Sequence, residues 1–104
     1  MFPSRSPVAT EPKRIELHLD SDPRFAAAAG GVVRYLAESI GMPEEVCREF
    51  QQAAVQACSE AFAARSDSAH IVELLIYADR LEVTVDPGAG AAAKRLSRSV
   101  VAQT

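Results

Sequence analysis

The residues best suited to chemistry in this chain form a short loop motif, Asp86-x-Gly88-x-Gly90. Glycines at this spacing let a backbone approach a ligand closely, and an aspartate can accept a hydrogen bond from that ligand. The motif lacks the Lys-Ser/Thr pair of a P-loop, and it is not the GxGxxG sequence of dinucleotide-binding folds. The Asp-Pro-Gly sequence within it is also favourable turn chemistry. Two interpretations therefore stay open, a ligand-binding loop and a plain turn.

Two cysteines and two histidines are the other side chains that commonly bind metals or act as nucleophiles. Cys47 and Cys58 lie eleven residues apart, about three helical turns, so they share one face of a helix but are too distant for a disulfide. His18 and His70 belong to different predicted elements, and the chain has no Cys-x-x-Cys pair. We therefore predict buried, reduced thiols that pack as small apolar groups, an exposed His18, and no metal site built from these residues.

Hydrophobic periodicity predicts the first two elements that must position these residues. Strict alternation over residues 14–19 predicts a half-buried strand, with His18 on its polar side. Asp22 as N-cap and Pro23 at the first position then predict a helix that ends at Gly41. The pair Gly30-Gly31 inside this helix indicates close approach of a neighbouring element. The predicted apolar stripe comprises Phe25, Ala29, Val32, Leu36 and Ile40.

The remaining elements complete an α+β pattern. A second helix is predicted over 43–64, where Glu44 and Glu45 suit the N-terminal dipole. Residues 70–86 predict a hairpin that turns at Ala78-Asp79, and 91–102 predict a short terminal helix. The order is strand, helix, helix, strand, strand, helix, so we predict a two-layer sandwich with the helices on one face of a mainly antiparallel sheet. Residues 14–104 form this single domain, and the Pro-rich residues 1–13 are predicted to be a disordered tail. The predicted stripe of the second helix comprises Val46, Cys47, Phe50, Ala53, Ala54, Ala57, Cys58 and Ala61.

Charge and composition limit the partners and the location. Residues 15–86 carry thirteen acidic side chains and five arginines, a formal charge of −8, whereas residues 87–104 carry +3. An acidic central region repels a phosphate backbone, so we expect no nucleic-acid partner and favour a basic or polar protein surface. No apolar run reaches the roughly 18–20 residues that span a membrane, and residues 1–12 lack the apolar segment of a secretory signal. We therefore expect a cytoplasmic protein without membrane contact.

Three segments of the chain follow the order and motifs of one protein family. The first is the strand over 15–19 followed by Ser21-Asp22-Pro23, the second is the long helix over 45–64, and the third is the hairpin that closes on Asp86-Pro87-Gly88-Ala89-Gly90. Over residues 14–90 the chain thereby resembles the anti-sigma-factor serine kinases, a branch of the GHKL (histidine-kinase-like, Bergerat-fold) ATPases. The resemblance implies an ATP-binding fold and a role in the control of transcription through protein contacts.

The resemblance also assigns roles on the long helix. In that family the helix carries a Glu as candidate base, an Asn four residues later that holds magnesium, and often a His. Gln56, Glu60 and Ala64 occupy these positions here, with Gln56 and Glu60 on one face of the helix. Gln56 cannot accept a proton near neutral pH, and the chain contains no asparagine at all. Glu60 can still ligate Mg²⁺, so we name it as candidate metal ligand and assign no catalytic residue.

The family's loop aspartate accepts a hydrogen bond from the adenine amino group, and its glycines admit the nucleotide. Asp86, Gly88 and Gly90 would inherit these cofactor-binding roles. The alternation of the preceding strand opposes this, because Asp86 directly follows the apolar Val85 and so points away from the core unless a bulge shifts the register. The family's second glycine motif, its ATP lid and the strands after the lid have no counterpart in the remaining sequence.

Three hypotheses follow. The first is a shortened GHKL-like domain that has lost ATP hydrolysis, needs no cofactor, and binds a sigma factor or an anti-anti-sigma factor. Since the family forms dimers and a shortened sheet leaves an exposed edge, a homodimer is also expected. The second is an active serine protein kinase that binds ATP and Mg²⁺, with Glu60 as magnesium ligand and the terminal helix in place of the lid. The third is an unrelated small α+β subunit.

Overall fold

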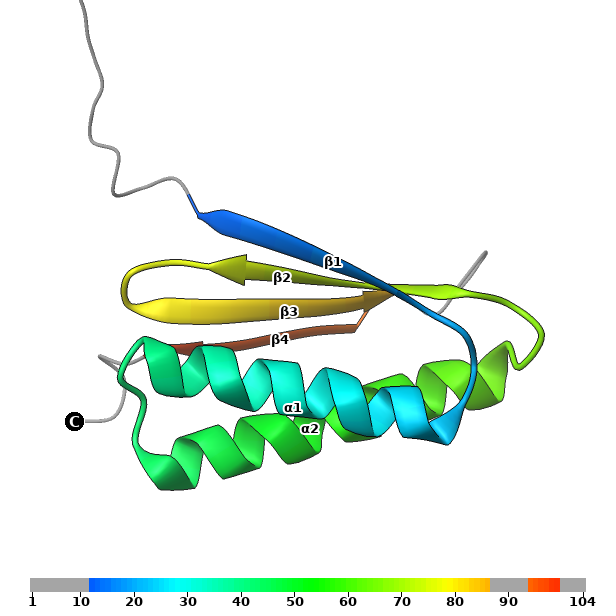
Figure 1. Cartoon of the computed structure of the whole chain (residues 1–104), viewed down its shortest axis with the longest axis horizontal. Helices are drawn as coiled ribbons and strands as arrows, with labels where there is room; N and C mark the ends of the chain where they lie inside the picture. The colour runs from blue at the N-terminus through cyan, green and yellow to red at the C-terminus, as the bar shows by residue number, and fades with distance from the viewer. Residues whose placement is uncertain (1–11, 87–93, 100–104) are drawn as a thin grey trace, which may run out of the picture.

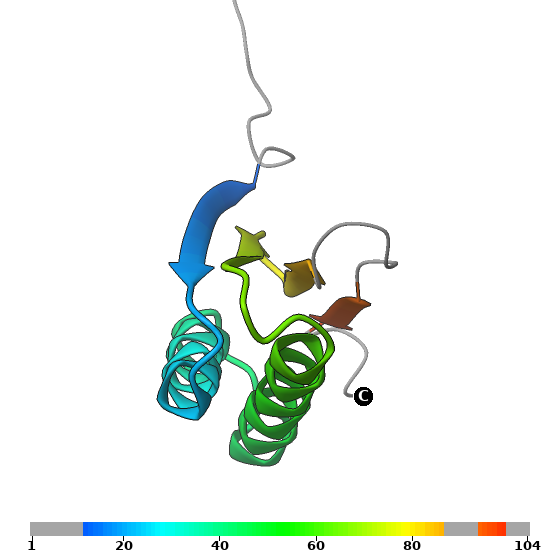
Figure 2. The same ribbon diagram turned by 90° about the vertical axis from the view of Figure 1, so that its right-hand side faces the viewer.

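The computed structural model describes residues 12–86 and 94–99. The elements in chain order are β1 (Lys13–Leu19), α1 (Pro23–Ser39), α2 (Glu44–Ala64), β2 (His70–Ile76), β3 (Arg80–Asp86) and β4 (Lys94–Ser99) (Figure 1). The four strands form one antiparallel sheet in the order β1-β2-β3-β4. Both helices lie on the same side of this sheet (Figure 2). The predicted α+β two-layer sandwich is confirmed, whereas residues 1–11 of the predicted tail lie outside the described part of the chain.

The last predicted element is wrong, because residues 94–99 form a strand and not part of a helix over 91–102. β4 pairs with β3 so that Leu96 lies opposite the buried Val83. The four-residue spacing of apolar side chains suggested a helix, but pairing satisfies the backbone groups along this side of β3. β4 also corrects the expectation that no strand follows the glycine loop. Lys94, Leu96 and Arg98 share the side of β4 that faces the helices, because their partners in β3 are buried.

Helix boundaries follow the predicted capping signals. The Asp22 side chain accepts a hydrogen bond from the Arg24 backbone N–H at 2.9 Å, and Pro23 occupies the first helical position. α1 ends next to Gly41, whose φ of 90° is the left-handed conformation that glycine adopts without strain. Glu44 and Glu45 lie in the first turn of α2, where the positive end of the helix dipole favours them.

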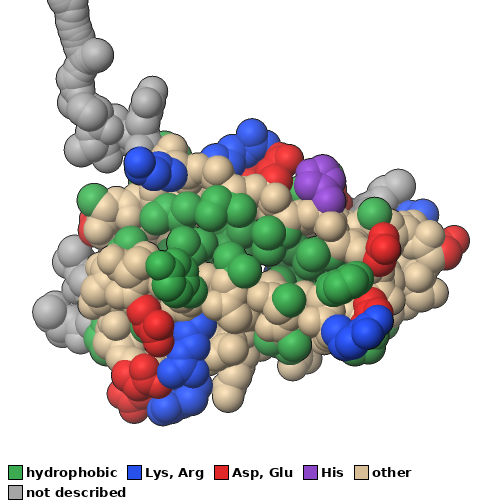
Figure 3. Space-filling model, viewed as in Figure 1, with side chains coloured by type: hydrophobic (Ala, Val, Ile, Leu, Met, Phe, Trp, Pro, Cys, Tyr) green, Lys and Arg blue, Asp and Glu red, His purple; other side chains and the backbone are tan. Residues whose placement is uncertain are grey.

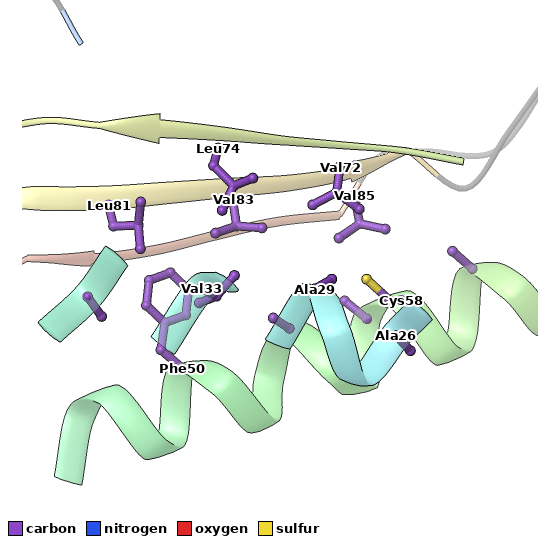
Figure 4. Close-up of a cluster of buried hydrophobic side chains, with 14 of the residues drawn as sticks. Ala26, Ala29, Val33, Phe50, Cys58, Val72, Leu74, Leu81, Val83 and Val85 are labelled. Atoms are coloured by element: carbon purple, nitrogen blue, oxygen red, sulfur yellow. The ribbon is translucent and has the colours of Figure 1, made fainter. Parts of the chain in front are cut away.

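The core lies between the helices and the inner face of the sheet (Figure 4). Phe50 and Phe62 are the largest side chains buried in it, and Cys47 and Cys58 are buried and form no disulfide, as predicted. Burial raises the pKa of the Cys58 thiol to about 11. The sheet contributes Val72, Leu74, Leu81, Val83 and Val85, and each such side chain removed from water stabilises the fold by roughly 1.5–3 kcal/mol.

The buried face of α1 differs from the predicted stripe. Of that stripe only Ala29 is buried, while Phe25 is 37% exposed and Val32, Leu36 and Ile40 are only partly covered. The reason is that α1 turns its smallest side chains to the core and to α2, and hydrophobic periodicity favours the face with the largest ones. The face of α1 that is buried comprises Ala26, Ala29, Gly30, Val33 and Ala37. The predicted stripe of α2 agrees better, since six of its eight members are buried.

Gly30 is a point of close contact between the two helices. A Cβ placed on Gly30 would lie 2.4 Å from Val55 Cγ2 and 3.2 Å from the backbone oxygen of Gln51, both on α2. A Cβ placed on Gly31 would meet nothing within 4 Å. The predicted close approach is therefore confirmed for the first glycine of the pair and not for the second.

These two neighbouring glycines provide a matched test of the helix contact. We expect Gly31→Ala to raise the free energy of unfolding by about 0.5–1 kcal/mol, because alanine favours a helix over glycine. We expect Gly30→Ala to lower it by about 1–2 kcal/mol, because the overlap with Val55 outweighs the same gain. Urea denaturation of both variants measures the difference, and equal stabilisation by the two substitutions would contradict the close contact.

The charge on Asp22 gives a pH-dependent prediction. Hydrogen bonds from the side chain and then the backbone of Arg24 lower the pKa of Asp22 to about 2. Because an unfolded aspartate has a pKa of about 3.9, the ionised cap stabilises the fold above that pH and loses its effect as the pH falls to about 2. We expect Asp22→Asn, which keeps a capping oxygen but no charge, to be less stable than the wild type at neutral pH, with the difference shrinking as the pH falls through about 2. A stability difference that stays constant over this range in urea titrations would refute the assignment.

Candidate functional site

Gln56 and Glu60 lie together on the exposed surface of α2, as their spacing predicts. Gln56 Nε2 donates a hydrogen bond to Glu60 Oε2 at 3.0 Å, and Lys94 Nζ of β4 lies 3.5 Å from Glu60 Oε1. The Gln56 hydrogen bond first, and the Lys94 charge second, lower the pKa of Glu60. Ala64 is exposed in the last turn of the same helix. Glu60 is thus an ionised carboxylate that already has one cationic neighbour.

A metal ligand set is not evident around Glu60. Within residues 12–86 and 94–99, no three side chains of His, Cys, Asp or Glu are grouped closely enough to hold a metal ion. Glu60 as a magnesium ligand therefore remains a prediction that rests on the family resemblance. Gln56 borders an open depression of about 500 Å³ between the two helices, where Arg34 and Arg48 also contribute to the lining.

Asp86 lies at the end of β3 with an exposed side chain. The pairing of β2 with β3 runs without a bulge, with Val72 opposite Val85 and Ile71 opposite Asp86. Since both valines are buried, Asp86 points to the face of the sheet that the helices do not cover, as the alternation predicts. Gly88 and Gly90 lie outside the described residues. The sheet therefore separates the Asp86 side chain from Gln56 and Glu60, which belong to the helical layer.

His70 lies beside the backbone of Asp86, and no role was predicted for it from the sequence. It is 1% exposed, its Nδ1 lies 3.3 Å from the Asp86 carbonyl oxygen, and its Nε2 lies 2.9 Å from Ser21 Oγ and 3.0 Å from the Arg65 carbonyl oxygen. Its ring also contacts Phe62, with centroids 5.1 Å apart. His70 thus joins the segment before α1, the end of α2 and the end of β3. His70 lies two residues before the buried Val72, on the same face of the strand, so the alternation in the sequence already indicated that it would be buried.

A partly covered hydrophobic surface is the second candidate site. α1 packs on β2 and β3, so the helix-facing side chains of β1 are only partly covered. Figure 3 shows a continuous hydrophobic band between β1 and α1 on this side of the molecule. We define the apolar strip as Ile15, Leu17 and Leu19 of β1 together with Phe25, Val32 and Leu36 of α1.

The three α1 residues of the apolar strip belong to the stripe that the sequence predicted to be the core. Residues 25, 32 and 36 follow one another at helical spacing, so they project from one flank of α1. Arg34 of α1 reaches Gln51 of α2 at 3.2 Å, and Gly30 contacts α2 as well. The apolar flank therefore points away from α2. The largest apolar side chains of α1 remain accessible to a partner.

The hydrogen bonds of His70 can be tested against its packing. We expect His70→Phe, which keeps a ring against Phe62, to lower the free energy of unfolding by about 1–3 kcal/mol, because the polar contacts of the buried imidazole with Ser21, Arg65 and Asp86 are lost. The same substitution at the exposed His18 is the control, with an expected change within about 0.5 kcal/mol. Urea denaturation measures both values. If His70→Phe is as stable as the wild type, His70 acts through packing alone.

Comparison with known protein families and with curated proteins finds no match to this chain. None of the helices in the described ranges is long and apolar enough to cross a membrane.

Proposed function

We propose that this chain is a regulatory protein-binding module that acts by contact with a protein partner, in a circuit of the anti-sigma or partner-switching kind, without hydrolysing ATP. The observation that carries the proposal is the apolar strip between β1 and α1. The resemblance to anti-sigma-factor serine kinases supplies the kind of partner, a sigma factor or an anti-anti-sigma factor.

The apolar strip supports protein binding because contiguous apolar surface is unfavourable in water. When a partner covers apolar surface, each Å² removed from water favours the complex by roughly 25 cal/mol of free energy. Contiguous patches on small proteins commonly mark interaction sites, whereas single exposed apolar residues do not. The strip combines side chains from two elements, and its Phe25 lies 37% exposed at the first turn of α1.

The arrangement around α2 supports the absence of ATP hydrolysis. Gln56 has no basic group to accept a proton, and it donates its amide hydrogen to Glu60. The side chain of Asp86 lies on the opposite side of the sheet from both residues. A nucleotide that contacted both Asp86 and the Gln56–Glu60 pair would therefore require a different register of β3, or a different face of α2 turned toward the sheet.

A second candidate function, an ATP- and Mg²⁺-binding serine kinase, is favoured by one observation. Glu60 is exposed, and its lowered pKa keeps it ionised, which is the form that a hard cation binds. Lys94 at 3.5 Å opposes this function, because a cation beside the carboxylate competes with the metal. We therefore retain it as the alternative.

Titration with ATP and Mg²⁺ distinguishes the two functions. We expect isothermal calorimetry of the full chain to detect no heat of binding at millimolar nucleotide, and we expect no ATP hydrolysis. Saturable heat that Asp86→Ala or Glu60→Gln abolishes would establish nucleotide binding and overturn the proposal.

Partner binding is tested by a two-hybrid screen of the chain against the sigma factors and sigma-factor antagonists of its host. We expect an interaction that Phe25→Ser weakens, because this residue belongs to the apolar strip. Tyr35→Ser is the matched control on the same helix, since Tyr35 is 69% exposed and lies outside the strip. An interaction with equal sensitivity to both substitutions would contradict the role of the strip.

A further inference from the structure

A serine and a buried histidine meet at one end of the sandwich, although they lie 49 residues apart in the sequence. Ser21 precedes α1, and its Oγ lies 2.9 Å from Nε2 of His70 in β2. The other ring nitrogen, Nδ1, lies 3.3 Å from the carbonyl oxygen of Asp86. A hydroxyl within hydrogen-bond distance of an imidazole that a third group orients is the arrangement that activates a serine as a nucleophile.

From this contact and the depression beside it we infer that Ser21 is a nucleophile, with His70 as its general base, and that it accepts the acyl group of small apolar esters. The inference goes beyond the proposed function, because the apolar strip and the Gln56–Glu60 pair take no part in it. The bond from Ser21 Oγ to the acyl carbon forms, the bond from that carbon to the alkoxy oxygen breaks, and the serine proton passes through His70 to the leaving alcohol. Water then releases the acid by the same proton route and restores the serine.

The Ser21 hydroxyl has a single hydrogen and three acceptors within reach. Besides His70 Nε2, these are the carbonyl oxygens of Arg65 at 2.9 Å and of Ser68 at 3.0 Å. The carbonyl oxygens hold the hydroxyl in place, but only the imidazole can remove its proton near neutral pH. The two carbonyl groups therefore position Ser21, and His70 is the group that activates it.

The polar atoms around His70 are complementary to the ring after it has taken the proton. A neutral imidazole has one N–H, whereas the imidazolium has two. The Asp86 carbonyl oxygen faces Nδ1, and the Arg65 carbonyl oxygen lies 3.0 Å from Nε2, so each N–H of the imidazolium has an acceptor. Interactions that are stronger with the ion formed during the reaction than with the starting state lower the barrier.

The depression beside Ser21 limits which substrates fit. It lies between the start of α1 and the end of α2 and has a volume of about 270 Å³. This volume is below the roughly 300–1,000 Å³ of sites for drug-sized ligands, so a short acyl chain fits best. No charged side chain of the described residues lines it, so a neutral substrate is favoured. The residues that line it are Ser21, Pro23, Ser59, Phe62 and Ala63.

A serine-directed fluorophosphonate tests the nucleophile directly. Attack of Ser21 Oγ on phosphorus displaces fluoride and leaves a stable adduct, which mass spectrometry of peptides locates. We expect an adduct on Ser21 of the full chain and its loss in Ser21→Ala. Ser59→Ala is the matched control, because Ser59 lines the same depression from α2, and it is expected to keep the adduct. No adduct, or equal labelling of both serines, would overturn the inference.

Hydrolysis of p-nitrophenyl butyrate measures the activity on an ester. We expect the full chain to release nitrophenol at a rate that falls roughly a hundredfold in Ser21→Ala and in His70→Gln. The rate of Ser59→Ala is expected to stay within about twofold of the wild type, because this serine lies outside the proton route. Equal rates in all four proteins would show hydrolysis without the serine and would overturn the inference.

A thiol in place of the hydroxyl keeps the inference testable if Ser21→Ala weakens the fold. In Ser21→Cys the proton of the introduced thiol passes to His70, and the thiolate is the form that iodoacetamide alkylates. We expect alkylation at about pH 6 to be at least about tenfold faster than in Ser59→Cys, whose thiol lies in the same depression. The natural Cys47 and Cys58 are buried, which limits background reaction. Equal rates in the two variants would overturn the inference, because His70 would then not activate the side chain beside it.

Discussion

The close contact between α1 and α2 at Gly30 is the constraint on which the rest of the surface depends. With no Cβ at this position, the backbone of α1 approaches Val55 and Gln51 more closely than any other residue type would allow. This contact fixes the rotation of α1 about its axis. The side chains that α1 then presents to the sheet are small, and the larger Val32 and Leu36 are carried to the flank beside β1. A packing requirement inside the helical layer thereby creates the apolar strip outside it.

The two edge strands of the described sheet, β4 and β1, differ in the side chains that they turn toward the helices. β4 carries Lys94 and Arg98 toward the helices, where they contact Glu60 and the Phe50 ring of the same chain. In β1 the alternation places Ile15, Leu17 and Leu19 on the helix-facing side, after Lys13 at the start of the same side, and Arg14, Glu16 and His18 on the other side. Among the described residues, the apolar strip thus lies at the β1 edge of the sheet, whereas Glu60 contacts Lys94 at the β4 edge.

The region around Asp86 has a structural role that its motif does not reveal. The buried His70 ring binds the backbone of Asp86 and Arg65 and the hydroxyl of Ser21, so three segments far apart in the sequence are held at one end of the sandwich. The contact involves the carbonyl oxygen of Asp86 and leaves the carboxylate on the uncovered face of the sheet. Asp86 belongs to β3, and because residues 87–90 lie outside the described residues, the ligand-loop and plain-turn interpretations of the Asp-Pro-Gly sequence both stay predictions.

The sequence by itself determined the strand over residues 14–19, both helices, the Asp22 cap of α1, the hairpin, the burial of the cysteines and the outward direction of Asp86. Each of these depends on local alternation, capping chemistry or turn residues, which act between neighbours in the chain. Only the tertiary structure decided that residues 94–99 form a strand, because the partner that stabilises it, β3, is brought beside it by folding. It also decided which face of α1 is buried and what His70 contacts. Hydrophobic periodicity shows that a face is apolar, but only packing against α2 decides whether that face enters the core or remains for a partner.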